Sequence, residues 1–211
     1  MNIQAAIAQV VAGQSLSRAD METVMRTVMQ GEATEAQVGG LLVGLRMKGE
    51  TIDEIVGAAS VMRSLATPVD IDTDGLIDLA GTGGDGANLF NVSTAATFVV
   101  AGAGGRIAKH GNRSVSSSSG SSDVLSALGV DLSVSPATIA DCIASIGVGF
   151  MFAPMHHSAM KHAIGPRQQL AMRTIFTISD FFQEYAVPVS RFARCFQTFQ
   201  QGFIKKRILP L

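Results

Sequence analysis

Two loops in the middle of the chain combine glycines, hydroxyl side chains and permanent cations. The first is Gly81-Thr82-Gly83-Gly84-Asp85-Gly86, and the second extends from Lys109 to Ser122. Glycines let a backbone adopt positive φ angles and approach a ligand with no Cβ atom in the way. Lys109 and Arg113 add charge, and the serines of the second loop add hydroxyl groups. Residues of these types are suited to binding a phosphate or another anion.

Each loop follows an apolar, strand-like segment, 76–80 for the first and 106–108 for the second, and a helix is expected between them over 95–104. A helix N-terminus presents N–H groups and a positive dipole end, which favour an anion. Parallel strands joined by a helix bring their carboxyl ends to one edge of the sheet, where α/β folds bind ligands. The two loops are therefore expected to form two sides of one site. The first loop matches neither a Walker A sequence nor a dinucleotide-binding Gly-x-Gly-x-x-Gly turn.

The surrounding elements follow from capping signals and periodicity. Ser17 with Asp20, Thr34 with Gln37 and Thr51 with Glu54 resemble capping boxes and predict helices near 18–30, 34–48 and 51–65. Further elements are predicted as helices over 124–129, 136–146 and 156–164, and a strand over 148–152. The N-terminal third is thus helical, and an α/β portion begins at Leu76.

Several of these runs resemble, in the same order, the motifs of anthranilate phosphoribosyltransferase. They are Asp78-Leu79-Ala80-Gly81-Thr82-Gly83-Gly84-Asp85, Phe90-Asn91-Val92-Ser93-Thr94, Lys109-His110-Gly111-Asn112-Arg113 and Ser119-Gly120-Ser121-Ser122-Asp123-Val124-Leu125. Segments around residues 31–34, 45–50 and 152–167 are also similar to that family. The resemblance extends from the start of the chain to about Phe176.

The resemblance implies an α/β fold class, with an N-terminal helical domain followed by a truncated α/β phosphoribosyltransferase domain of the nucleoside-phosphorylase/anthranilate-phosphoribosyltransferase type. Residues 1–67 would form the helical dimerisation domain, 68–176 an incomplete domain that binds phosphoribosyl pyrophosphate, and 177–211 a divergent basic, phenylalanine-rich tail. The implied enzyme is a glycosyltransferase (pentosyltransferase) of tryptophan biosynthesis, a homodimer with Mg²⁺ as cofactor. It would transfer phosphoribosyl from phosphoribosyl pyrophosphate to the amino group of anthranilate and release pyrophosphate.

The site residues implied by the resemblance fall into three groups. The residues that would contact phosphoribosyl pyrophosphate are Gly81, Gly84, Asp85, Asn91, Ser93, Thr94, Lys109, His110, Gly111, Asn112, Arg113, Ser114, Val115, Ser116, Ser117 and Ser121. Those that would hold anthranilate are Gly81, Asn112 and Arg167, and Ser93 would also bind the metal. The acidic pair that binds Mg²⁺ in the family is absent, and no catalytic acid or base is assigned, because positioning of the reactants could suffice.

Beyond Phe176 the sequence departs from the family. Residues 177–211 hold six of the eleven phenylalanines and carry net positive charge, whereas residues 1–176 carry net negative charge. We expect a truncated or frame-shifted version of a longer enzyme, or a junction between sequences. An amphipathic C-terminal helix is the alternative, because Phe192, Phe196, Phe199 and Phe203 recur at helical spacing. For function, the alternatives are a non-catalytic relative or fragment that binds phosphate ligands or nucleic acid, and a nucleoside phosphorylase.

Composition limits the classes of protein to which this chain can belong. The 211 residues are 47% hydrophobic and 16% charged, which suits a buried globular core, and the net charge of −1 gives no general attraction to nucleic acid. Cys142 and Cys195 form neither a disulfide framework nor a zinc-ligand set. With no leader and no long apolar run, a cytoplasmic protein without a membrane partner is expected.

Overall fold

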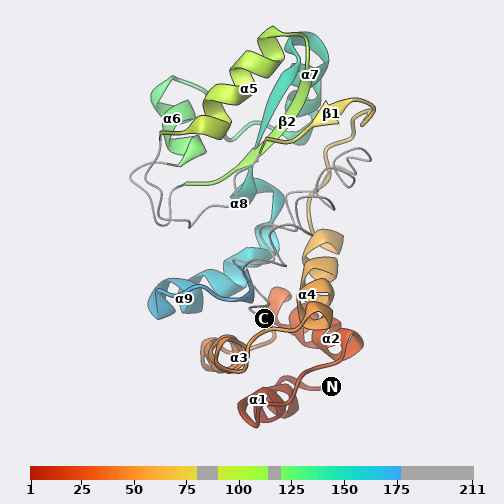
Figure 1. Ribbon diagram of the computed structural model, residues 1–211, viewed down its shortest axis with the longest axis vertical. Helices are drawn as coiled ribbons and strands as arrows, with labels where there is room; N and C mark the ends of the chain where they lie inside the picture. The colour runs from red at the N-terminus through yellow and green to blue at the C-terminus, as the bar shows by residue number, and fades with distance from the viewer. Residues whose placement is uncertain (80–89, 114–119, 177–211) are drawn as a thin grey trace, which may run out of the picture. The chain divides into compact units, whose positions relative to one another are not determined.

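The computed structural model describes residues 1–79, 90–113 and 120–176, and its contacts divide the chain into two compact units (Figure 1). The described part of the first unit is residues 1–67 and 154–176, and that of the second is residues 68–79, 90–113 and 120–153. The predicted divergent tail and its alternative amphipathic helix fall on 177–211, outside the described residues. No helix in the described ranges has the length and apolar character needed to cross a membrane.

The first unit is helical, which confirms the helical prediction for the N-terminal third. Its elements are α1 (Ile3–Val11), α2 (Arg18–Met29), α3 (Glu35–Lys48), α4 (Ile52–Ser64), α8 (Ala153–His156), the 3-10 turn η1 (Ser158–Met160) and α9 (Lys161–Leu170). Helix α1 packs on α3, and α2 packs on α4. Ser17, Thr34 and Thr51 cap α2, α3 and α4 as predicted, the last two with complete capping boxes. Helix α1, capped by Asn2, was not predicted.

The helix predicted over 156–164 is wrong at its start. The chain leaves helical geometry at His157, turns through η1 and begins α9 only at Lys161. Contacts distant in sequence explain the break. The backbone N–H of Thr67 donates to the carbonyl of His156 (2.7 Å), and Nδ1 of His156 lies 3.0 Å from the carbonyl of Thr67. These two contacts tie residue 156 to the end of the N-terminal segment, and a local apolar period contains no sign of them.

The core of the helical unit is built from aliphatic and methionine side chains. Fully buried examples are Met21, Met25, Leu41, Leu42, Leu45 and Met62. The C-terminal part of this unit joins the same core through Met160, Ala163, Ile175 and Phe176. Residues 154–176, which the sequence assigns to the α/β portion, therefore pack with the helices because their apolar side chains complete the helical core.

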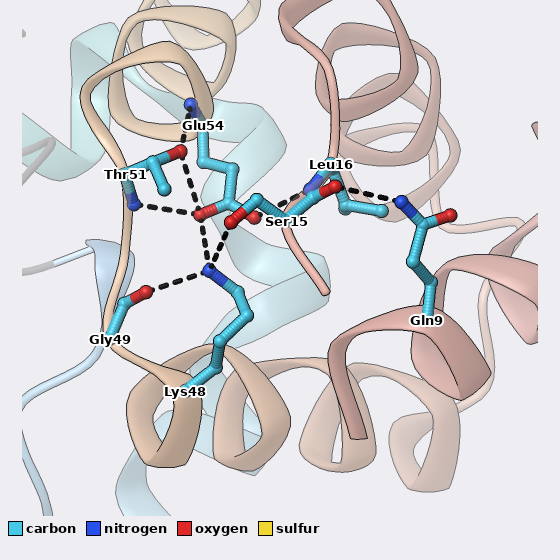
Figure 2. A network of polar contacts seen from close by, with 7 residues as sticks. All are labelled: Gln9, Ser15, Leu16, Lys48, Gly49, Thr51 and Glu54. Carbon is cyan, nitrogen blue, oxygen red and sulfur yellow. Dashed lines mark hydrogen bonds and ion pairs between the residues drawn. The ribbon is translucent and has the colours of Figure 1, made fainter. Parts of the chain in front are cut away.

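A buried polar network connects three chain segments of the helical unit, and Figure 2 shows it from close by. At its centre, Lys48 Nζ at the end of α3 donates to Glu54 Oε2 in the first turn of α4 (2.9 Å). Glu54 also accepts from the backbone N–H groups of Thr51 and Leu16, each at 2.8 Å. Lys48 further donates to the carbonyl of Gly49 (2.7 Å). The network thus connects the turn after α1 to the junction between α3 and α4.

In its described residues the second unit is a three-stranded parallel sheet with helices against it, which confirms the predicted α/β portion (Figure 1). Its elements are β1 (Leu76–Ile77), α5 (Val92–Gly102), β2 (Arg106–Gly111), α6 (Ser121–Ala127), α7 (Pro136–Ile146) and β3 (Val148–Phe152). The strand order is β1-β2-β3, with Ile77 paired to Ile107 and His110 paired to Met151. Helix α7 and strand β3 match the predicted bounds.

Two features of this unit explain its layering. Ile139 and Ile143 of α7 form a buried cluster with Ala108 of β2 and Met151 of β3. Helix α5 contacts the same two strands, with Thr94 and Thr97 buried. The helices on the strands leave the carboxyl ends of β1 and β2 to continue into the loops that the sequence marks for ligand binding.

Candidate functional site

The carboxyl ends of β1 and β2 lie next to each other, because the two strands are parallel neighbours. This confirms that the two strands that precede the candidate loops end at the same edge of the sheet. The first loop, 81–86, lies outside the described residues, and of the second loop the structure describes residues 109–113 and 120–122. The predicted contacts Gly81, Gly84, Asp85, Ser114, Val115, Ser116 and Ser117 lie outside the described residues.

Lys109 is the central cation of this edge. Its side chain is almost entirely buried, with 2% of the residue exposed, although it carries an ammonium group. Nζ donates to the carbonyl of Leu79 just beyond β1 (2.7 Å) and to Oγ of Ser93 in the first turn of α5 (3.3 Å). The lysine thereby connects β1, β2 and α5. An ammonium group held at this edge, where water is largely excluded, is suited to an anionic ligand.

The N-terminus of α5 supplies the second component of the site. Asn91 stands at the N-cap, but its side chain makes no capping hydrogen bond. Ser93 and Thr94 occupy the first turn, and Oγ1 of Thr94 is buried with no hydrogen-bond partner among the described residues. Buried hydroxyl groups are normally satisfied, so this arrangement fits a ligand that brings acceptors. The dipole of the helix adds to the preference for an anion.

The loop after β2 supplies the third component. His110 is buried, whereas Asn112 and Arg113 are exposed where the chain leaves the sheet. Oδ1 of Asn112 accepts from the backbone N–H of Arg113 (2.7 Å), and its carbonyl accepts from the backbone N–H of Ser122 at the start of α6 (3.4 Å).

Gly111 lets α6 approach the end of β2. A Cβ atom at Gly111 would collide with the side chains of Ser121 and Phe150, so only glycine permits this approach. The predicted residues Ser93, Lys109, Gly111 and Ser121 are therefore connected through the end of β2.

Asp78 belongs to the same edge, although sequence reasoning gave it no role in the site. It follows β1 directly, is 6% exposed, and its Oδ1 accepts the backbone N–H of His110 (3.2 Å). The signal that could have found it is a single carboxylate inside the otherwise apolar segment 76–80, because a buried acid requires partners.

Arg167, the predicted anthranilate contact, lies on α9 in the helical unit. Its guanidinium carbon is 5.3 Å from the centroid of the Phe176 ring, a cation–π arrangement. The aromatic ring stacks against one face of the guanidinium group and restricts the orientation of that group.

No group of three or more His, Cys, Asp or Glu side chains in the described ranges is arranged to hold a metal ion. His156 and His157 are both buried in the helical unit, and Nδ1 of His156 contacts the carbonyl of Thr67. For Mg²⁺, which prefers oxygen ligands, Ser93 offers one hydroxyl oxygen. The residues described therefore fit Mg²⁺ only when a ligand contributes most of the oxygens, as a diphosphate would.

The buried His157 makes stability depend on pH. Burial, reinforced by the neighbouring His156, lowers the pKa of His157 from 6.5 to about 4. Between these values the unfolded chain binds the proton and the folded chain does not, so the contribution of His157 to stability falls as pH falls from about 6.5 toward about 4. We expect this group to lower the free energy of unfolding by about 2 kcal/mol between pH 7 and pH 5.

Comparison of the wild type with His157→Gln isolates this contribution in urea titrations. A comparison is needed because Asp78, whose pKa is raised to about 7, stabilises the fold as pH falls over the same range. Relative to the wild type, the variant should gain about 2 kcal/mol on going from pH 7 to pH 5. Equal pH dependence in the two proteins would contradict the assignment.

Two family models match the chain, one in each part of the sequence. A family model for the α/β domain of a glycosyl transferase family matches residues 73–179, and the helical bundle domain of the same family matches residues 4–66. The chain belongs to this glycosyl transferase family. The order of the two matches agrees with the predicted fold class, a helical domain followed by an α/β domain.

Curated relatives in this glycosyl transferase family are anthranilate phosphoribosyltransferases, which confirms the resemblance inferred from the motifs. The protein of Teredinibacter turnerae is 67% identical over 178 residues, which is 84% of this chain and 52% of the relative. That of Cellvibrio japonicus is 66% identical over the same length and the same shares. The chain thus spans about half the length of the curated relatives it matches.

Solved structures agree with this glycosyl transferase assignment. The anthranilate phosphoribosyltransferase of Thermus thermophilus superposes with a TM-score of 0.78 at 41% identity, over 85% of this chain and 54% of that chain. The enzyme of Saccharomyces cerevisiae in complex with phosphoribosyl pyrophosphate and Mg gives a TM-score of 0.78 at 27% identity, over 86% and 55%.

Proposed function

We propose that this glycosyl transferase binds phosphoribosyl pyrophosphate and anthranilate and transfers the phosphoribosyl group to the amino nitrogen of anthranilate, with release of pyrophosphate. The observation that carries the proposal is the buried Lys109 ammonium, held between the end of β1 and the first turn of α5 by Leu79 and Ser93. Such an arrangement suits a diphosphate, which brings several charges to one place. The likeness to the curated anthranilate phosphoribosyltransferases names the reaction.

The proposed reaction requires the protein to bind anionic groups and to position the two reactants. When pyrophosphate departs from the ribose, negative charge grows on the leaving group, and fixed donors aimed at that charge lower the barrier. In this proposal Lys109 and the hydroxyls of Ser93 and Thr94 supply such donors at the sheet edge. The aromatic amine needs no strong base, so correct orientation of the reactants provides much of the acceleration. The other described residues proposed for the same site are Asn91, His110, Gly111, Asn112, Arg113 and Ser121.

Mg²⁺ belongs to the proposal as a companion of the diphosphate. It would supply positive charge to the leaving group, and Ser93 is the described residue proposed to contact it. The 3.3 Å bond from Lys109 to Ser93 places a second cation beside that oxygen. The lysine would therefore neutralise phosphate charges next to those that the metal neutralises.

Arg167 is proposed to bind the carboxylate of anthranilate, and Asn112 is proposed as a further anthranilate contact from the family resemblance. Its guanidinium group can form two parallel hydrogen bonds to a carboxylate, a geometry that an ammonium group cannot reproduce. The Phe176 ring beneath it limits the orientations that the side chain can adopt.

Assembly and compartment are also proposals. We place the homodimer contact on the helical domain over 1–67, where Val11, Met47 and Ile52 are strongly exposed apolar side chains. Exposed apolar side chains gain free energy when they are buried against a partner. A cytoplasmic location fits a chain with two cysteines that form no disulfide framework.

The test is fluorescence-monitored consumption of anthranilate by the purified chain with phosphoribosyl pyrophosphate and Mg²⁺. We expect turnover, and we expect Arg167→Ala to raise the KM for anthranilate by about tenfold or more, because it removes hydrogen bonds to a charged group. Arg26→Ala on α2, an exposed arginine of the same unit, is the matched control and should leave KM unchanged.

The matched part covers about half of each relative, and this coverage favours one second candidate: phosphate binding without transfer. Calorimetric binding of phosphoribosyl pyrophosphate by a folded chain that consumes no anthranilate would establish that candidate. Failure of the folded chain to bind the compound at all would overturn both.

A further inference from the structure

Asp78 is a buried carboxylate at the edge of the sheet, and the reaction described above does not use it. It is 6% exposed and comes immediately after the last residue of β1. Oδ1 accepts the backbone N–H of His110 (3.2 Å), whereas Oδ2 is buried and has no hydrogen-bond partner among the described residues. Burying a carboxyl oxygen without a hydrogen-bond partner costs free energy, so the position of Asp78 calls for an explanation.

The position of Asp78 compensates for the short length of β1. Strand β1 pairs with β2 only through Leu76 and Ile77, opposite Arg106 and Ile107. Strand β2 continues to Gly111, so its later N–H groups extend beyond the paired part of β1. The carboxylate of Asp78 takes the place of a backbone carbonyl for one of them, that of His110. Buried backbone donors need such a partner.

The hydrogen bond acts on the residue next to the central cation. Lys109 precedes His110, and its Nζ donates to Leu79, the residue after Asp78. Asp78 and Leu79 thus hold β2 at two consecutive residues, one through a side chain and the other through a carbonyl. Any shift of the His110 backbone would move the base of the Lys109 side chain, and small displacements of a binding group can cost a large part of its effect.

The charge that acts on Asp78 is the Lys109 ammonium of β2, and the other contacts are the backbone N–H groups of His110 and Leu79. Burial raises the pKa of Asp78 to about 7, although the His110 N–H, the charge of Lys109 and the Leu79 N–H oppose the rise. An ionised Asp78 repels an incoming phosphate, and a protonated one does not.

We propose that Asp78 is a positioning residue of the phosphate site, whose carboxyl oxygen anchors the His110 backbone and thereby fixes the Lys109 ammonium where the diphosphate binds. The proposal rests on the proposed function for the identity of the ligand. Its geometric part, the anchoring of His110, stands independently of any ligand.

The experiment compares Asp78→Ala, which loses the acceptor, with Asp78→Asn, which keeps an acceptor oxygen without charge. Asp131→Ala is the control, because Asp131 also accepts a backbone N–H, that of Ser133, but is exposed and lies in the loop before α7. For the full-length chain, hydrogen exchange of the His110 amide is measured by NMR. The Kd for phosphoribosyl pyrophosphate with Mg²⁺ is measured by calorimetry from pH 6 to 8.

We expect Asp78→Ala to speed His110 exchange and to weaken binding by about tenfold or more, the effect of losing a hydrogen bond to a charged group. Asp78→Asn should keep the protection and the affinity to within about threefold. It should also lose the part of the pH dependence in which wild-type binding weakens as pH rises through about 7. The control should match the wild type throughout.

The possible outcomes distinguish the positioning role of Asp78 from the proposed function. Wild-type exchange and affinity in Asp78→Ala, or identical defects in the alanine and asparagine variants, would overturn the positioning role. A wild-type chain that binds no phosphoribosyl pyrophosphate would overturn the proposed function, while His110 exchange would still decide whether Asp78 anchors β2. If the alanine variant fails to fold, the asparagine variant decides through its exchange and its pH profile.

Discussion

Glu54→Ala is expected to lower the free energy of unfolding by about 3–5 kcal/mol, because it leaves a buried lysine without its counter-ion. Glu54 is inaccessible to solvent, and the Lys48 side chain is 5% exposed. The same change removes the acceptor of two backbone N–H groups, those of Leu16 and Thr51. Leu16 is buried, so its N–H group would be left unsatisfied at further cost. Urea titration of the variant and the wild type measures the loss.

The chain offers a matched control one residue earlier in the same helical turn. Asp53 pairs with Arg18 at 2.8 Å, but the two side chains are 63% and 54% exposed. Asp53→Ala should therefore cost no more than about 1 kcal/mol. Equal losses in the two variants would contradict the assignment of the stability to the buried network around Glu54.

The network also has a pH signature. Burial by itself raises the pKa of Glu54, but the hydrogen bonds from Thr51, Lys48 and Leu16 outweigh it and leave the pKa below 4.5. A carboxylate with a lowered pKa in the folded state stabilises the fold above its unfolded value, and this contribution is lost as pH falls through the folded value. The loss occurs below pH 4.5, whereas the loss from His157 occurs mainly above that pH.

One half of this network could be identified from the sequence, and the other half could not. Thr51 and Glu54 are three residues apart and have the types of a capping box, so their local bonds were predictable. The bond from Leu16 to Glu54 joins residues 38 positions apart. No local rule assigns such a contact. The start of α4 could therefore be predicted from the sequence. The burial of Glu54 could not, because it depends on a contact between distant segments.

The α/β unit follows the same division. Ser135 and Pro136 predicted the start of α7, and Ser135 does cap it by accepting the N–H of Thr138. The parallel pairing of β1 with β2 could be inferred because one helix, α5, joins them. By contrast, the break at His157 depends on Thr67, and the role suggested for Asp78 depends on the length of β1. Both are consequences of how distant segments meet, which periodicity along the chain does not encode.

Lys109→Met is expected to weaken binding of phosphoribosyl pyrophosphate by about a hundredfold or more, because it removes a buried cation from beside the diphosphate. Methionine fills a similar elongated volume, and an apolar side chain avoids the cost of burying a charge. These gains oppose the cost of leaving the Leu79 carbonyl and the Ser93 hydroxyl without a donor, so thermal melting shows whether the variant remains folded. Calorimetry and thermal melts of one preparation measure both quantities.

Lys161→Met is the matched control for this change, because Lys161 is an exposed lysine at the start of α9. The control also removes one positive charge. It should leave the Kd unchanged, because an exposed ammonium group contributes little to binding. If Lys109→Met folded and bound within about threefold of the wild type, the buried ammonium would not be a phosphate ligand. Its contacts with Leu79 and Ser93 would then serve only to join β1, β2 and α5. If only Lys109→Met loses affinity and the variant remains folded, the buried ammonium serves to bind the ligand.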